Sequence, residues 1–205
     1  KQTLRQVIPF SGFMGVNRIA SSLASRMDVL LLIQITGSYE AGIYGAANRL
    51  AIGVPLILGS FATVLAPRFA SISNKDELLI FLRRSMGISA LITFGLIFGV
   101  LVAPFVIFLF GPAYSDSSAV LQLLFISFIP SAISVPAVNF VIYSLKKPQI
   151  ITAVSFLQLP IIVLVNVLFI PKIGPFAPAV ALGLANLLMM ISVFFITWKE
   201  LRNKI

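Results

Sequence analysis

The chain has 205 residues, of which 59% are apolar and 10% charged, and its mean hydropathy is +1.07. Soluble domains average about 45–50% apolar and about 25% charged residues. The composition therefore excludes an ordinary soluble domain, a disordered tail and a disulfide-stapled secreted module, and it indicates a polytopic membrane protein. Because the chain has no Cys and no His, thiol chemistry, a histidine general base and a zinc site are excluded, and we expect no metal and no cofactor.

Six stretches are long enough to cross a bilayer core of about 30 Å, which needs roughly 20 mostly apolar residues per helix. In chain order these stretches are 7–35, 42–67, 86–110, 117–145, 148–170 and 174–198. The last four contain no charged residue, whereas the first contains Arg18, Arg26 and Asp28. We therefore expect an all-α fold in which residues 1–205 form a single six-helix transmembrane bundle.

The basic residues predict the orientation of this bundle. If the N-terminus is cytoplasmic, the inside segments hold eleven of the fifteen basic residues and the outside loops hold only Lys172. Cytoplasmic loops are enriched in Lys and Arg, so both termini are predicted to be cytoplasmic. The eleven residues are Lys1, Arg5, Arg68, Lys75, Arg83, Arg84, Lys146, Lys147, Lys199, Arg202 and Lys204. Because topology explains the net charge of +9, no nucleic-acid partner is expected.

Milder polar residues and glycines within the spans are expected to join helices. We predict interhelical hydrogen bonds for single amides and for a serine stripe. These residues are Asn139, Gln158, Asn166, Asn186, Ser127, Ser131 and Ser134. Small residues permit close helix contact, which is predicted for Gly95, Gly99 and Gly183.

Charged residues in the first span are the strongest functional signal. Each charge costs about 2.5–3.5 kcal/mol at mid-bilayer. At 100° per residue, Ser22 and Ser25 lie within about 40° of Arg18, and Arg26 lies about 80° from it. Such a polar stripe on an apolar helix is typical of a helix that lines a cavity. Alternatively, Arg26 extends to the headgroups or pairs with Asp28.

Arg49, in the second span, either extends towards the membrane surface or points into the same cavity. Guanidinium groups stay protonated and match the geometry of phosphate oxygens. Several of them with one nearby carboxylate, Asp28, predict an anionic substrate such as a phosphate or pyrophosphate rather than a cationic drug. The sequence has no phosphate loop, so ATP hydrolysis is excluded and transport would use an ion gradient or the substrate's own concentration difference.

Three segments carry a family resemblance. They are the run Arg26-Met-Asp-Val-Leu-Leu-Leu, the run Ala41-Gly-Ile-Tyr-Gly-Ala-Ala-Asn-Arg-Leu50, and Val64-Leu-Ala-Pro-Arg68. Together they resemble the polysaccharide transporter family, the O-antigen and lipid-linked oligosaccharide flippases of the multidrug/oligosaccharidyl-lipid/polysaccharide exporter superfamily. The turn Phe110-Gly-Pro-Ala-Tyr114 is also similar to that family.

The resemblance implies a fold of two six-helix lobes around a central cavity, and the chain is similar to the second lobe. It implies that the protein moves undecaprenyl-pyrophosphate-linked sugar units across the bacterial cytoplasmic membrane by alternating access. The N-terminal lobe of the same protein, membrane lipids, polysaccharide polymerases and a coupling proton or sodium ion would be its partners. Carried over by position, Arg18, Arg26 and Arg49 would bind the pyrophosphate, with Ser22 and Ser25 beside them. Asp28 would couple an ion or pair with an arginine, since no other buried carboxylate is expected in this lobe.

Other functions remain open on the sequence alone. A lipid II flippase or a multidrug cation antiporter of the same superfamily is the nearest alternative. A membrane scaffold that holds glycan-polymerising partners without transporting anything is another. An enzyme is not expected, because no nucleophile–base pair or metal constellation is visible.

Overall fold

In the computed structural model of the chain, residues 28–203 are described, and they form helices joined by short turns with no strand. Residues 28–36 are helical. The helices that follow are α2 (Ser38–Ala51), α3 (Gly53–Ser71), α4 (Lys75–Leu109), α5 (Ser117–Asn139), α6 (Pro148–Ile173) and α7 (Ala177–Asn203). Two 3-10 turns, η1 (Pro112–Tyr114) and η3 (Gly174–Phe176), and a π-helical segment, η2 (Phe140–Ser144), complete the order. The all-α prediction is confirmed.

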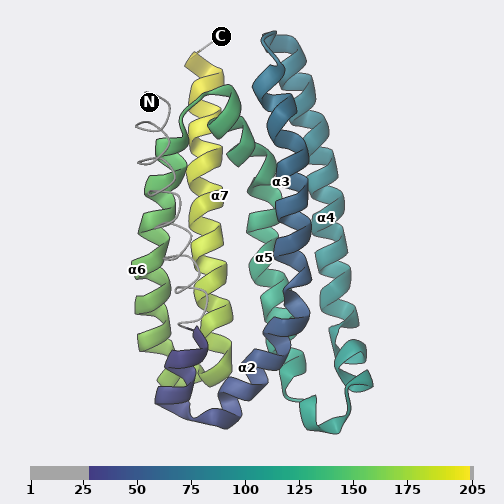
Figure 1. Cartoon of the computed structure of the whole chain (residues 1–205), viewed down its shortest axis with the longest axis vertical. Helices are drawn as coiled ribbons and strands as arrows, with labels where there is room; N and C mark the ends of the chain where they lie inside the picture. The colour runs from purple at the N-terminus through teal and green to yellow at the C-terminus, as the bar shows by residue number, and fades with distance from the viewer. Residues whose placement is uncertain (1–27, 204–205) are drawn as a thin grey trace, which may run out of the picture.

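Four segments of the described chain are long and apolar enough to cross a membrane. They are Ser38–Ser71, Lys75–Leu109, Ser117–Ser144 and Pro148–Arg202. The last segment contains both α6 and α7, which turn back on each other at η3 and pack side by side (Figure 1). The chain is therefore a multi-pass membrane protein by the length and composition of its helices. Most of the first expected span, 7–35, lies outside the described residues, so the expected number of six spans stays a prediction.

The second expected span is bent. Instead of one helix over 42–67, the structure has α2 and α3, which meet at Ile52 and differ in direction (Figure 1). Pro55 has no backbone N–H to donate to the carbonyl of Ala51, one turn earlier, so the helix cannot continue straight through this position. The bend places α2 across one end of the bundle, while α3 runs along it.

Helix α4 extends beyond the third expected span, 86–110, by eleven residues at its start. Helix α4 begins at Lys75, where the Asn74 side chain accepts a hydrogen bond from the Asp76 backbone N–H at 2.9 Å. This N-cap, together with acidic residues in the first turn, stabilises the helix start. With 35 residues and a rise of 1.5 Å each, α4 is about 52 Å long, so one end projects beyond a hydrocarbon core of about 30 Å. Arg83 and Arg84 lie on this helix and not in a loop.

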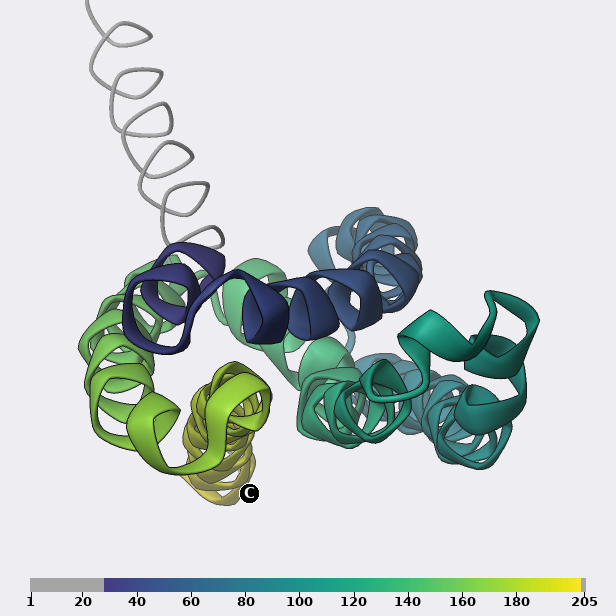
Figure 2. The ribbon, with the colours of Figure 1, turned by 90° about the horizontal axis from the view of Figure 1, so that it is seen from below.

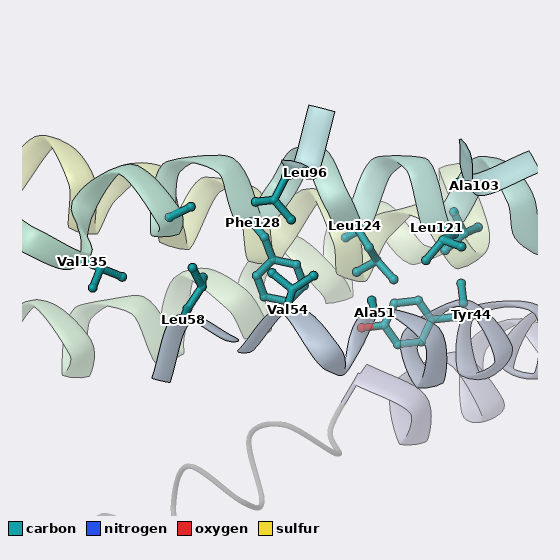
Figure 3. Close-up of a cluster of buried hydrophobic side chains, with 14 of the residues drawn as sticks. Tyr44, Ala51, Val54, Leu58, Leu96, Ala103, Leu121, Leu124, Phe128 and Val135 are labelled. Carbon is teal, nitrogen blue, oxygen red and sulfur yellow. The ribbon is translucent and has the colours of Figure 1, made fainter. Parts of the chain in front are cut away.

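Helix α5 lies at the centre of the bundle, in contact with α2, α3, α4 and α7 (Figure 2). Its buried residues Leu121, Leu124 and Phe128 meet Val54 of α3 and Leu96 of α4 in one apolar cluster (Figure 3). Because α5 contacts four other helices, it is the central element of the bundle.

Hydrogen bonds between helices hold α5, α6 and α7 together. The Ser127 hydroxyl lies 2.7 Å from the Ala179 carbonyl oxygen, and Asn186 Nδ2 donates to the Ser127 carbonyl at 2.9 Å. Gln158 Nε2 donates to the carbonyl of Ala185 at 2.6 Å. The predicted interhelical role is thus confirmed for Ser127, Gln158 and Asn186.

The same prediction is wrong for Asn139 and Ser134. Asn139 bonds the carbonyl of Val135, and Ser134 bonds that of Ser131, each within its own helix. Asn166 is buried, and neither polar atom of its side chain has a hydrogen-bond partner in the part of the chain that the structure describes.

Close helix contact was predicted at three glycines. Gly99 packs on Phe125 and Gly183 packs on Ser127, whereas a Cβ at Gly95 would meet no atom within 4 Å among the described residues.

Basic residues are concentrated at one of the two ends of the bundle. The α3–α4 junction, the η2–α6 junction and the end of α7 lie at one end, which we call the basic end, and η1, η3 and the start of α2 lie at the other (Figure 1). Lys75, Lys146, Lys147, Lys199 and Arg202 all lie at or near the basic end, and Lys172 lies near the opposite end. The loops expected on one side of the membrane therefore share one end, and the cytoplasmic assignment of that end stays a prediction.

Candidate functional site

Four of the six predicted site residues lie outside the described part of the chain. These are Arg18, Ser22, Ser25 and Arg26. Their expected role in a cationic cavity stays a prediction. The structure describes the remaining two, Asp28 and Arg49.

Asp28 is held by a tyrosine from the next helix. Tyr44 Oη, on α2, donates a hydrogen bond to Asp28 Oδ2 at 3.1 Å. The Tyr44 side chain is 2% exposed and lies in the same apolar cluster as Ala51 and Leu121 (Figure 3). Buried tyrosine hydroxyls need a polar partner, and Asp28 supplies it. The bond therefore fixes the helical stretch 28–36 to α2.

The second oxygen of Asp28 is available for another interaction. Oδ1 is buried and has no hydrogen-bond partner among the described residues. Burying a carboxylate oxygen without a partner costs free energy, so such an atom favours a proton, a cation or a guanidinium donor. The geometry thus agrees with both interpretations left open for Asp28, ion coupling and arginine pairing.

Arg49 lies apart from this pair. It occupies the last turn of α2 and is exposed, and no ion pair joins it to Asp28 or to another described carboxylate. The buried face of α2 consists of Ala41, Tyr44, Ala47 and Ala51. Arg49 is five residues after Tyr44, or about 140° around the helix from it. The structure therefore does not bring Arg49 and Asp28 together.

Sequence reasoning missed a second carboxylate, Glu40. Its Oε2 is buried without a hydrogen-bond partner in the described chain, and the carboxylate lies against Gly174 in the α6–α7 turn. A methyl group at Gly174 would collide with it, and Gly174 also has φ +53°, a conformation that favours glycine. The expectation that Asp28 is the only buried carboxylate of this lobe is therefore wrong. The sequence did not predict that Glu40 is buried, because Glu40 follows the Thr36-Gly37-Ser38 turn and lies between two expected spans, where a carboxylate is expected to be exposed.

The first turn of α2 also contacts the α4–α5 connection. Tyr39 Oη donates to Asp116 Oδ2 at 2.7 Å. Since Tyr39 and Glu40 are neighbours, α2 touches two turns of the bundle at once, one before α5 and one before α7. This explains how a short helix lying across the end of the bundle is kept in place.

The described residues offer little for other chemistry. They contain no group of three or more Asp or Glu residues placed to hold a metal ion. Polar groups within the apolar helices include the Asp28–Tyr44 pair and the hydrogen-bonded serines and amides of α5 to α7. Asp28, with one carboxylate oxygen on Tyr44 and the other buried without a described partner, is therefore the candidate site residue that the structure describes best.

Comparison with known proteins agrees with the motifs in the sequence. Residues 1–73 match the family model described as polysaccharide biosynthesis protein. No curated protein and no solved structure matches the chain. The matched segment runs through α2 and α3 and contains Asp28, Tyr44 and Arg49. The match covers residues 1–73 alone and agrees with the family that the sequence motifs resemble.

Proposed function

We propose that the chain is part of a flippase that moves undecaprenyl-pyrophosphate-linked oligosaccharide units across the bacterial cytoplasmic membrane for surface polysaccharide synthesis. One observation carries the proposal. The segment that matches polysaccharide biosynthesis proteins, 1–73, is also the segment that holds every charged residue expected inside the apolar spans. Charges within a membrane are tolerated where they face a water-filled path or a partner, and they commonly mark the path of a substrate or ion.

In this proposal the arginines bind the pyrophosphate, and Asp28 binds a coupling ion or pairs with an arginine. Arg18 and Arg26 contact the phosphate oxygens, with the hydroxyls of Ser22 and Ser25 as additional donors. Asp28 keeps one oxygen on Tyr44 at 3.1 Å and uses the other for a coupling proton, a sodium ion or an arginine. The exposed Arg49 contacts the substrate from α2, at the face that an N-terminal lobe of the protein would cover. Alternating access between the lobes completes the cycle, and a polysaccharide polymerase takes over the product.

A complementation assay tests the arginines. The intact protein would be expressed in a strain that lacks its own surface-polysaccharide flippase, and surface glycan would be scored at matched membrane abundance. We expect Arg18→Ala, Arg26→Ala and Arg49→Ala to reduce surface glycan, because each removes a phosphate ligand. Arg83→Ala, which removes an exposed arginine of α4, is the control and is expected to have no effect. Normal glycan in all three variants would contradict the cationic-cavity mechanism.

A second pair of variants tests Asp28. Asp28→Asn keeps the size and the hydrogen-bonding ability of the side chain but removes its charge. We expect it to abolish transport, while Tyr44→Phe, which removes only the 3.1 Å hydrogen bond, reduces transport partially. If Asp28→Asn transports normally, Asp28 is a structural partner of Tyr44 and takes no part in coupling.

A further inference from the structure

A pocket at the basic end has no role in the proposed function. Its volume is about 340 Å³, and it lies between the end of α3, the first turns of α4, η2 and the last turns of α7. Ligand sites commonly begin at about 300 Å³. Phe69 and Phe140, both buried, form its inner wall and pack edge to face with 6.3 Å between ring centroids. Because four chain segments converge on this wall, the pocket is a preformed part of the fold.

Cationic and hydroxyl side chains line the outer part of this pocket. They are Lys75, Lys146, Tyr143 and Ser73, all of which are exposed. Lys146 makes no ion pair with a described residue, whereas the adjacent Lys147 pairs with Glu200. Glu200 also lines the pocket, and its pairing with Lys147 compensates its charge. The pocket therefore combines apolar walls with a positively charged rim.

The backbone at Lys146 is unusual. Its φ is +54°, and no other non-glycine residue in 28–203 has a positive φ. The conformation is disfavoured for residues with a side chain. Two backbone hydrogen bonds hold it in place, from Leu145 N–H to Phe140 O at 3.0 Å and from Lys147 N–H to Val141 O at 3.1 Å. Strained residues of this kind concentrate at functional sites.

Two features place the pocket at the level of the lipid headgroups. The apolar part of α4 begins at Met86, just after Arg83 and Arg84, so the turns that line the pocket lie up to about 16 Å beyond the start of the apolar segment. Trp198, 58% exposed, lies at the same end of α7, just before the pocket residue Glu200. Exposed tryptophans are enriched at the membrane–water interface.

We propose that this pocket binds the phosphate-bearing headgroup of an anionic phospholipid. Lys146 and Lys75 contact the phosphate, the hydroxyls of Tyr143 and Ser73 donate to it, and the apolar wall receives the glycerol and the upper acyl chain. Basic pockets between transmembrane helices at the cytoplasmic surface suit such headgroups. The apolar wall favours a lipid over free phosphate, because free phosphate has no apolar part to bury there.

Lipid titration of the intact protein in neutral detergent tests the proposal. The probes are short-chain phosphatidylglycerol, short-chain phosphatidylcholine and inorganic phosphate, each added separately. Bound lipid is counted by native mass spectrometry, and the thermal midpoint is followed in parallel. We expect phosphatidylglycerol to bind most tightly and to raise the midpoint. Lys146→Gln should weaken its binding about tenfold, the effect of losing one charge-assisted hydrogen bond.

Lys199→Gln is the matched control, because Lys199 is an exposed lysine of α7 at the same end but does not line the pocket. We expect it to bind phosphatidylglycerol like the unmodified protein. Lys146→Gly, which suits the positive φ, should keep the fold and still lose binding, so that weak binding cannot be attributed to unfolding.

Three results would overturn the proposal. They are equal weakening by Lys146→Gln and Lys199→Gln, equal binding of phosphatidylcholine, and equal stabilisation by inorganic phosphate. The first would indicate diffuse attraction to the whole basic end, the second an unselective lipid groove, and the third a site for free phosphate. None of these measurements depends on transport, so failure here leaves the proposed flippase function untouched.

Discussion

Helices α4 and α5 are both long and apolar, yet their surroundings differ. The candidate span of α4 has a mean hydropathy of 2.6, against 1.9 for the span that contains α5. In the α5 span 39% of the apolar window is buried, compared with 17% in α4. The more apolar helix thus lies on the outside of this bundle. Lipid tails are as apolar as leucine, so hydropathy alone does not drive a helix to the centre of a membrane protein, and close packing and hydrogen bonds decide its place.

The largest expected difference between α4 and α5 is in the loss of stability when a leucine is truncated to alanine. Leu124 of α5 is fully buried, whereas Leu101 of α4 is 73% exposed. Leu124→Ala leaves a cavity and should lower the free energy of unfolding by about 2–4 kcal/mol. Leu101→Ala should change it by less than about 0.5 kcal/mol. Unfolding of the purified protein in mixed micelles of increasing SDS content measures both values, and equal losses would mean that α4 is as enclosed as α5.

Enlarging a glycine should give the next largest contrast. A Cβ at Gly183 of α7 would lie 3.1 Å from Ser127 Oγ and 3.5 Å from Ser127 Cα on α5, whereas a Cβ at Gly95 of α4 meets nothing within 4 Å. Gly183→Leu should therefore destabilise the fold by about 1–3 kcal/mol through overpacking. Gly95→Leu should be neutral or stabilising, since leucine has a higher helix propensity than glycine. The same unfolding assay checks this pair, and a neutral Gly183→Leu would show that α5 and α7 can separate freely.

Loss of a hydroxyl should have the smallest effect. Ser127→Ala removes the 2.7 Å contact with the Ala179 carbonyl on α7, and such interhelical bonds contribute about 0.6 kcal/mol on average. Thr93→Val on α4 removes a bond to the Ser89 carbonyl of its own helix and should cost less. The same unfolding assay compares the two single variants. In the double variant Ser127→Ala/Gly183→Ala the two losses of stability should not add, because both changes affect one contact. Strict additivity would contradict a shared α5–α7 contact.

Helix bounds and the partners of buried amides could not be predicted from the sequence. The third span was expected from Met86, because Arg83 and Arg84 interrupt the apolar run, and the helix itself continues back to Lys75, since a helix tolerates charges once it leaves the hydrocarbon core. Asn139 and Asn166 look alike in the sequence, yet one bonds its own helix and the other is buried without a partner in the described chain. The side chain that faces each amide depends on helix rotation, which a single apolar sequence does not encode.

The candidate site shows the same limit. The sequence singled out Asp28 because a carboxylate in an apolar span is costly, and the structure places it half-buried in a helix. The partner Tyr44 gave no comparable signal, since one tyrosine in a membrane helix is unremarkable in composition. Its selection as partner depends on the turn at Gly37, which folds α2 back onto the helical stretch 28–36.

By itself the sequence determined that the chain is an all-α membrane protein whose basic residues gather on one side of its apolar segments. These properties follow from the free energy of transferring residues into a bilayer, which depends on composition along the chain and not on neighbours. Only the tertiary structure decided that α5 is central, that α2 bends away from α3 at Ile52, and that Asp28 meets Tyr44 while Arg49 stays apart. These properties depend on which helix faces touch, and that choice rests on packing and hydrogen bonds between residues far apart in the sequence.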